Sequence, residues 1–264
     1  MIPKTIHYCW FGGNQKPELV ENCIASWHRF CPDWEIIEWN ESNYDVDKAE
    51  YTKEAYGCKK WAFVADYARF DVVNQFGGVY LDTDVELLDT IDGLCDNTAF
   101  YAFESGRNIA SGLGFGAEKE HETVKACLNY YTNKHFITDG KMDLTPCPRA
   151  NTESLCLLYP EFRRDGSTQV INNVLFLSMN EYGLLMKHLG TQSWVDYREN
   201  KSRVFKESRI KSMMRNPKTF ETIDRLFGEK VTNGYEFIVY DLIEYGALYY
   251  IRRAFVRGLK RRKR

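Results

Sequence analysis

GGVYLDTDVE, residues 77–86, joins two glycines to a short apolar run that ends in two carboxylates. Side chains two residues apart on a strand point to the same side of it. If this run stays extended, Asp82 and Asp84 project together. Two like charges so close raise each other's pKa unless a cation lies between them. The pattern favours a divalent metal such as Mg²⁺ or Mn²⁺, with a diphosphate completing its coordination shell. The alternative is an Asp-rich surface turn.

The segments on either side of this stretch predict an α/β domain. Residues 4–10 (KTIHYCW) and 34–39 (WEIIEW) are typical of strands, and residues 17–30 between them have apolar side chains at helical spacing. A strand, a helix and a strand in this order indicate a parallel pair. Residues 59–76 predict a long helix that ends at Gly77.

The rest of the chain continues with less regular signals. A short helix is expected at 48–56 and another at 121–131, with strands at 98–104, 112–116 and 172–177. Residues 133–170 are predicted to be irregular. Two further helices are expected at 207–227 and 234–257.

The composition is that of a globular protein. Of the 264 residues, 44% are hydrophobic and 27% are charged, and the net charge is −2. The eight cysteines include no Cys-x-x-Cys pair and lie mostly in apolar runs, as reduced thiols of a core do. No run of 18 apolar residues occurs, and no signal peptide precedes the first strand, so a cytoplasmic protein is expected.

Three residues outside the carboxylate stretch are candidates for a ligand site. Ligands of open α/β sheets bind at the carboxyl ends of strands, and Trp10 ends the first strand. Its ring would stack on a nucleotide base, or else it packs in the core. Asp66 and Arg69 are three residues apart and therefore neighbours on one helix face. The alternative for this pair is an exposed ion pair of little energetic value.

Four segments together resemble a known family. They are IPKTIHYCWFGG, CIASWHRFCPDWEIIEWNE, KKWAFVADYARFDVVNQFGGVYLDTDV and the later HLGTQSW. They resemble the DXD-motif sugar transferases of capsular-polysaccharide synthesis, which form glycosyltransferase family 32 and are related to the catalytic core of the large clostridial glucosylating toxins. The resemblance is dense over residues 2–86 and thinner to about 195.

The resemblance implies a GT-A fold, a Rossmann-like nucleotide-sugar-binding domain, in residues 1–200. Residues 201–264 then form a mainly helical extension with a basic tail. The implied activity is a metal-dependent transfer, with retention of configuration, from a nucleotide sugar to a glycan or lipid-linked acceptor in bacterial surface-polysaccharide synthesis. Mn²⁺ is the expected ion, with Mg²⁺ the alternative, and a UDP-sugar is favoured over a GDP-sugar.

The resemblance also assigns roles to residues. Trp10 would stack on the base. Asp66 and Arg69 would hold the donor sugar and its phosphate. Asp82 would be a third catalytic group that contacts the sugar, the ribose or the water shell of the metal. The residues expected to close over the diphosphate are His188, Ser193 and Trp194.

The implied metal ligands are Asp82, Asp84 and His188, with Asp84 the closest. The sequence departs from the family pattern at two places. The family often has two adjacent histidines where this chain has Lys187 and His188. The segment TPCPRANT resembles a family Thr-Gly-Pro sequence but has Cys147 in place of glycine, and no role is assigned to it.

Other functions remain open at this level. Asp82-Thr83-Asp84-Val85 also matches the signature of haloacid-dehalogenase phosphatases, in which Asp82 would be the nucleophile. A non-catalytic sugar-binding module is a further alternative. Residues 251–264 carry eight basic residues and no acidic one, interleaved with apolar side chains. Such a segment suits the anionic inner face of a membrane, and no nucleic-acid partner is expected.

Overall fold

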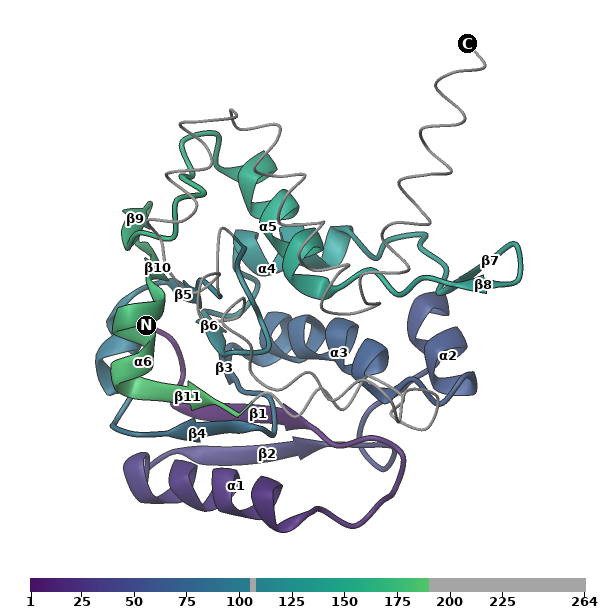
Figure 1. The fold of residues 1–264 in the computed structure, drawn as a ribbon, viewed down its shortest axis with the longest axis horizontal. Coiled ribbons are helices and arrows are strands. Elements are labelled where there is room, and N and C mark those ends of the chain that lie inside the picture. The colour runs from purple at the N-terminus through teal and green to yellow at the C-terminus, as the bar shows by residue number, and fades with distance from the viewer. Residues whose placement is uncertain (105–107, 190–264) are drawn as a thin grey trace, which may run out of the picture. The chain divides into compact units, whose positions relative to one another are not determined.

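The computed structural model describes residues 1–104 and 108–189, which form a mixed α/β fold around one large sheet (Figure 1). The seven strands of the sheet are β1 Thr5–Cys9, β2 Glu35–Trp39, β3 Gly78–Tyr80, β5 Ala99–Ala102, β6 Phe115–Ala117, β9 Gln169–Ile171 and β10 Val174–Leu177. Their order is β2-β1-β3-β6-β5-β10-β9. β1 pairs in parallel with β2 and β3, and β5 with β10. β6 and β9 run antiparallel to their neighbours. The predicted α/β class is confirmed.

Helices cover both faces of this sheet. They are α1 Glu18–Phe30, α2 Glu50–Gly57, α3 Trp61–Phe76, η1 Asp92–Asp96, α4 Glu122–Asn129, α5 Cys147–Leu158 and α6 Met179–Leu185. Figure 1 shows α1 on one side of the sheet and α3, α4 and α5 on the other. Two small ribbons complete the fold, β4 Val85–Leu87 with β11 Met186–His188, and β7 Ile137–Thr138 with β8 Lys141–Met142.

Alternating side chains of β3 and the residue after it divide the core into two layers. Val79 and Leu81 pack in the cluster that contains Trp27 of α1. Tyr80, which lies between them, packs in the cluster that contains Val64 of α3. Leu81 is fully buried, and burial of such a side chain contributes roughly 1.5–3 kcal/mol. β3 is therefore packed on both faces, and this packing fixes the position of the turn that carries Asp82 and Asp84.

Gly77 and Gly78 make the sharp turn between α3 and β3. Both have positive φ, 69° and 104°, a region that favours glycine. A Cβ on Gly78 would lie 2.8 Å from the carbonyl oxygen of Thr5 on β1. Gly77 therefore ends α3, as the sequence predicted, and Gly78 lets β3 lie close to the neighbouring strand β1.

The carboxylates themselves do not lie on an extended strand. β3 ends at Tyr80, and the backbone N–H of Val85 donates a hydrogen bond to the carbonyl of Asp82 at 3.0 Å. Asp82 to Asp84 thus form a turn between β3 and β4, and the prediction that both side chains project together from one side of a strand is wrong. Asp is favoured in turns because its short side chain bonds the local backbone.

The segment 133–170 was predicted to be irregular, and this is also wrong. It contains α5, which carries Pro148 in its first turn, where the missing N–H of proline has no helical partner in any case. It also contains β7, β8 and the start of β9. Proline breaks a helix when it lies in the interior but is tolerated at the start, which is where the two prolines of TPCPRANT lie. The expected strand at 112–116 begins later, at Phe115.

Two composition-based predictions concern residues within this part of the chain. All eight cysteines are free, and five of them are buried, as expected for reduced core thiols. Within 1–104 and 108–189, no helix is both long and apolar enough to cross a membrane. The expected helices at 207–227 and 234–257, the extension 201–264 and the basic tail lie outside the described residues.

Candidate active site

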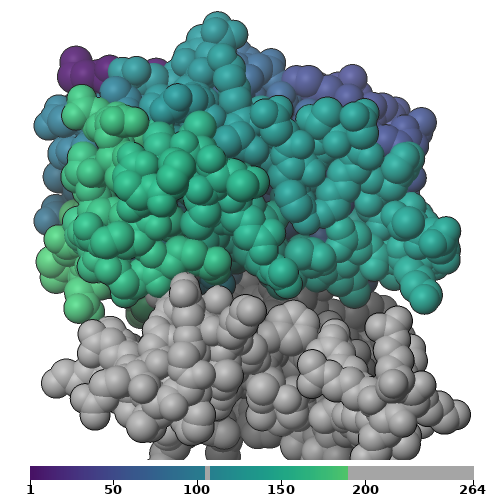
Figure 2. Space-filling model, turned by 90° about the horizontal axis from the view of Figure 1, so that it is seen from above, coloured from purple at the N-terminus to yellow at the C-terminus, as the bar shows by residue number. Residues whose placement is uncertain are grey.

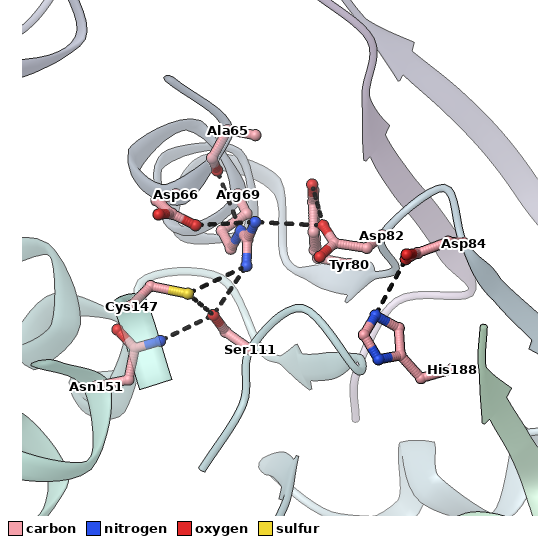
Figure 3. A network of polar contacts seen from close by, with 10 residues as sticks. All are labelled: Ala65, Asp66, Arg69, Tyr80, Asp82, Asp84, Ser111, Cys147, Asn151 and His188. Carbon is pink, nitrogen blue, oxygen red and sulfur yellow. Dashed lines mark hydrogen bonds and ion pairs between the residues drawn. The ribbon is translucent and has the colours of Figure 1, made fainter. Parts of the chain in front are cut away.

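The guanidinium of Arg69 is the centre of the site (Figure 3). α3 places Asp66 one turn before Arg69, and Arg69 Nη2 lies 3.0 Å from Asp66 Oδ1. The same nitrogen lies 3.2 Å from Asp82 Oδ1, in the turn that follows β3. The side chains of Arg69 and Asp66 are only 4% and 11% exposed. The structure therefore excludes an exposed i,i+3 ion pair and places the two residues in a buried cluster with Asp82.

Burial and charge act in opposite directions on this cluster. Burial raises the pKa of Asp66 and of Asp82, and the adjacent Arg69 lowers both, with a net rise for each carboxyl. Burial lowers the pKa of Arg69, but Asp82 and Asp66 more than offset this, so its pKa is well above the ordinary value. The guanidinium therefore stays charged, and the two carboxylates share one buried cation.

Tyr80 gives Asp82 a second fixed contact. Its hydroxyl donates a hydrogen bond to Asp82 Oδ1 at 3.0 Å, and the guanidinium carbon of Arg69 lies 5.0 Å from its ring centroid. Burial raises the pKa of Tyr80, so the phenol stays protonated and acts as a donor. The sequence analysis treated Tyr80 only as part of a strand. Its position two residues before Asp82 is the signal that could have identified it.

Gly112 gives the carboxylate of Asp82 the space it occupies. A Cβ on Gly112 would lie 2.3 Å from Asp82 Oδ2 and 3.4 Å from Arg69 Nη1. The backbone carbonyl of Gly112 also accepts a hydrogen bond from the N–H of Asp82 at 3.3 Å. A side chain at this position would therefore push the carboxylate out of its pairing with Arg69.

We expect Gly112→Ala to disturb function far more than stability. The new methyl meets the end of a side chain that can swing away, so the free energy of unfolding should change by less than about 1 kcal/mol. Misplacing a reacting carboxylate by about 1 Å can lower activity about 100-fold. Gly93→Ala is the control, since a Cβ there meets nothing within 4 Å. Chemical denaturation and activity, measured on both variants, check this prediction, and equal activity of the two variants would contradict it.

Asp84 points away from Arg69 toward His188 on β11 (Figure 3). His188 Nε2 lies 3.1 Å from Asp84 Oδ1, and His188 is opposite Val85 in the β4–β11 ribbon. Burial lowers the pKa of His188, but the hydrogen bond and charge of Asp84 outweigh this and raise it. The structure thus brings His188 to the carboxylate turn across about 100 residues of sequence, as expected. Its metal-binding role stays a prediction.

The donor set suits a cation that arrives with a phosphate ligand. Within 1–104 and 108–189, no group of three or more His, Cys, Asp or Glu side chains is arranged to hold a metal. Mg²⁺ is commonly bound by one or two carboxylates together with substrate phosphates, not by a cage of protein ligands. Asp84 and Asp82 supply oxygen ligands of that kind, so the residues present fit a metal that a diphosphate helps to bind.

Three polar residues to which the sequence analysis assigned no role complete the cluster. Ser111 precedes Gly112, and Cys147 and Asn151 lie in the first turns of α5 (Figure 3). Arg69 Nη1 lies 3.1 Å from Ser111 Oγ and 3.7 Å from Cys147 Sγ. Both partners are far from Arg69 in sequence, so no local pattern indicates them.

Trp10 follows β1, the strand next to β3, so it lies at the same edge of the sheet as the carboxylate turn. It is partly buried, and its ring N–H donates to the carbonyl of Asn14 at 2.7 Å. Lys16 Nζ lies 5.9 Å from the ring centroid. Base stacking by Trp10 stays a prediction. Ser193 and Trp194 lie outside the described residues.

One face of the described part of the molecule is formed mainly by its later residues. In Figure 2, most of the coloured surface is teal and green, the second half of the described residues. Asp66 and Arg69 are 8% and 4% exposed as whole residues.

A family comparison covers the central elements of the site. Residues 17–101 match the family model described as a glycosyltransferase sugar-binding region containing a DXD motif. Asp66, Arg69 and the sequence Asp82-Thr83-Asp84 lie inside this range. His188 and the partners of Arg69 in α5 lie outside it.

Two curated relatives come from Schizosaccharomyces pombe. Inositol phosphoceramide mannosyltransferase 3 is 27% identical over 147 residues, which are 51% of this chain and 40% of that protein. Inositol phosphoceramide mannosyltransferase 1 is 29% identical over 169 residues, 59% of this chain and 51% of that protein. The chain spans about half the length of these relatives.

Solved structures with a related arrangement include the PaToxG glycosyltransferase, with 17% identity and a TM-score of 0.49 over 60% of this chain and 70% of that chain. The assignment of the region rests on the sequence match, whose motif occupies the turn between β3 and β4. Residues 17–101 therefore match the glycosyltransferase sugar-binding region that contains a DXD motif, in agreement with the resemblance seen in the sequence.

Proposed function

We propose that this protein is a metal-dependent glycosyltransferase that moves a hexosyl group from a nucleotide sugar to a hydroxyl group of a glycan or lipid-linked acceptor. The observation that carries the proposal is the buried Asp66–Arg69–Asp82 cluster next to Asp84, all within the matched region. The GT-A form of the fold and retention of configuration are parts of the same proposal, which rests on the family resemblance.

The residues suit the charge that develops in such a transfer. The leaving group is a nucleoside diphosphate, which becomes more negative as the glycosidic bond breaks. Asp84 and Asp82 would hold the divalent ion, and that ion neutralises the diphosphate when bound. Arg69 keeps a positive charge in a buried place and holds the carboxylates of Asp66 and Asp82 in fixed directions. Such preorganised groups stabilise a transition state more than mobile ones do.

The names of the relatives suggest a donor to test first. Both are mannosyltransferases that act on inositol phosphoceramide. We therefore propose a mannosyl donor and a lipid-linked acceptor as the first candidates for this chain, alongside the UDP-sugar that the sequence analysis favoured. Contact of residues 251–264 with an anionic membrane, a cytoplasmic location and a role in capsule synthesis stay proposals of the sequence analysis.

The phosphatase alternative is less well supported. In that class the nucleophilic Asp normally ends the first strand, whereas Asp82 follows β3. Its Oδ1 atom already accepts hydrogen bonds from Arg69 and Tyr80. A nucleophilic oxygen with two donors is a weaker attacking group, and so these contacts favour a binding and orienting role.

A thermal-shift panel tests the proposed function. A ligand that binds only the folded state raises its stability by RT ln(1 + [L]/Kd), about 2.7 kcal/mol at 100 times Kd. We expect one of the UDP-, GDP- and CMP-sugars to raise Tm in the presence of Mn²⁺ and not in the presence of EDTA. Product analysis with the stabilising sugar then distinguishes a transferase from a binding module. An unchanged Tm with every sugar would contradict the proposal.

A further inference from the structure

We infer that Ser111, held in place by Asn151, is a positioning residue that fixes the guanidinium of Arg69 and, through it, the carboxylates of Asp66 and Asp82. This inference rests on the proposed function for its kinetic consequences. Its structural part concerns only contacts between the described residues.

All three nitrogens of the Arg69 guanidinium have protein partners in this arrangement. Arginine has five N–H donors. Nε donates to the carbonyl of Ala65 at 3.1 Å, and Nη2 donates to Asp82 at 3.2 Å. Nη2 also forms an ion pair with Asp66 Oδ1 at 3.0 Å. Nη1 donates to Ser111 Oγ and to the sulfur of Cys147. Each of the three guanidinium nitrogens thus contacts a protein group, which favours an action of Arg69 on a donor substrate through the carboxylates that it orients.

Of the two acceptors that contact Arg69 Nη1, the Ser111 hydroxyl is stronger than the Cys147 sulfur. An oxygen at 3.1 Å is a better acceptor than a thiol sulfur at 3.7 Å. Ser111 is fully buried, so no water competes for its hydroxyl oxygen. It also immediately precedes Gly112, whose missing side chain leaves room for Asp82. The loop that contains Ser111 and Gly112 therefore sets the positions of both the Arg69 guanidinium and the Asp82 carboxylate.

Asn151 fixes the hydroxyl of Ser111 from α5. Its Nδ2 donates to Ser111 Oγ at 2.8 Å, so the two lone pairs of that oxygen are used by Asn151 and Arg69 (Figure 3). Asn151 is 1% exposed, and its Oδ1 makes no hydrogen bond within the part of the chain that the structure describes. A buried amide with an unpaired oxygen is unfavourable. Its N–H contact to Ser111 is what this side chain contributes to the site.

The first test is a direct measurement on Arg69. In ¹⁵N NMR spectra of the full chain, a guanidinium held at both Nη atoms gives separate Nη signals because rotation about Cζ–Nε is slow. We expect separate signals in the wild type and merged signals in Ser111→Ala, with Arg69→Lys used to assign them. Asn151→Leu should act in the same direction and serves as the second variant if Ser111→Ala does not fold. Unchanged Arg69 signals in both variants would overturn the inference.

The second test is kinetic and uses a double-mutant cycle. We expect Ser111→Ala to lower kcat about 10- to 100-fold while the donor KM changes less than about twofold. The Arg69→Lys background lacks the planar guanidinium with its Nη1 donors. In that background, Ser111→Ala should lower kcat no further. Equal losses in both backgrounds would overturn the positioning role.

The control for both tests is Thr123→Val. It also removes a fully buried hydroxyl, which accepts a hydrogen bond from Tyr101 at 2.9 Å on another part of the fold. We expect Thr123→Val to leave the Arg69 signals and kcat unchanged. If the wild-type protein transfers no sugar, the proposed function fails while the NMR result still decides the inference.

Discussion

Asp84→Ala is expected to lower kcat/KM about 10³-fold, the upper range for removing one preorganised electrostatic group. Asp84 is the motif carboxylate that does not pair with Arg69, and its side chain is 13% exposed, facing His188. It is therefore the carboxylate best placed to bind an ion. Its removal should abolish the Mn²⁺ dependence of donor binding as well as the transfer. Calorimetric titration of the donor with and without Mn²⁺, together with steady-state kinetics, checks both effects.

The matched control is Asp89→Ala. Asp89 is an exposed acidic residue five positions further along, whose carboxylate bonds the N–H of Thr90 at 2.8 Å. The substitution removes the same charge without touching the turn, and we expect activity within about twofold of wild type, as for most surface substitutions. An Asp84→Ala protein as active as Asp89→Ala would show that no essential ion is held there.

The second large effect concerns stability. Arg69→Met leaves the buried Asp66 and the partly buried Asp82 without their cation. Breaking a buried ion pair by removing one partner typically costs about 3–5 kcal/mol. We expect a loss of this size in the free energy of unfolding at pH 7, measured by urea denaturation. Arg149→Met is the control, because Arg149 forms an exposed i,i+4 pair with Glu153, and such pairs contribute about 0.3–0.5 kcal/mol.

The pH dependence of this loss gives its physical cause. Without Arg69, burial raises the pKa of both carboxyls in the folded state further above their values in the unfolded chain. A group whose pKa is raised on folding loses stability as pH rises and regains it as pH falls. The destabilisation should therefore shrink as the pH is lowered toward about 4. A constant loss at all pH values, or one below about 1 kcal/mol, would contradict a charge-based cause.

The parts of the fold that the sequence predicted depend on local signals. Apolar spacing identified α1, α3 and the parallel pair of β1 and β2, and Gly77 identified the end of α3. The contact between Asp66 and Arg69 follows directly from helical spacing. Its burial does not follow, because that depends on α5 and on the segments packed against α3.

The parts that the sequence missed depend on contacts between distant segments or on competing local preferences. Asp82 and Asp84 lie in a turn, so they face different partners, where an alternating strand would have placed them together. Ser111 contacts Arg69 across 42 residues of sequence, and Asn151 contacts Ser111 across 40, with no periodic pattern that indicates either contact. The start of α5 was not predicted because TPCPRANT contains two prolines, and proline occurs both where a helix is broken and where one begins.

One measurement tests the central claim most directly. Crystals of the protein grown with Mn²⁺ and the nucleotide sugar that stabilises it would be examined at an X-ray energy where manganese scatters anomalously. The account predicts one anomalous peak within coordination distance of the Asp84 carboxylate and bridging to the diphosphate, with Arg69 still paired to Asp66 and Asp82. A bound nucleotide sugar without any anomalous peak at Asp84 would contradict it.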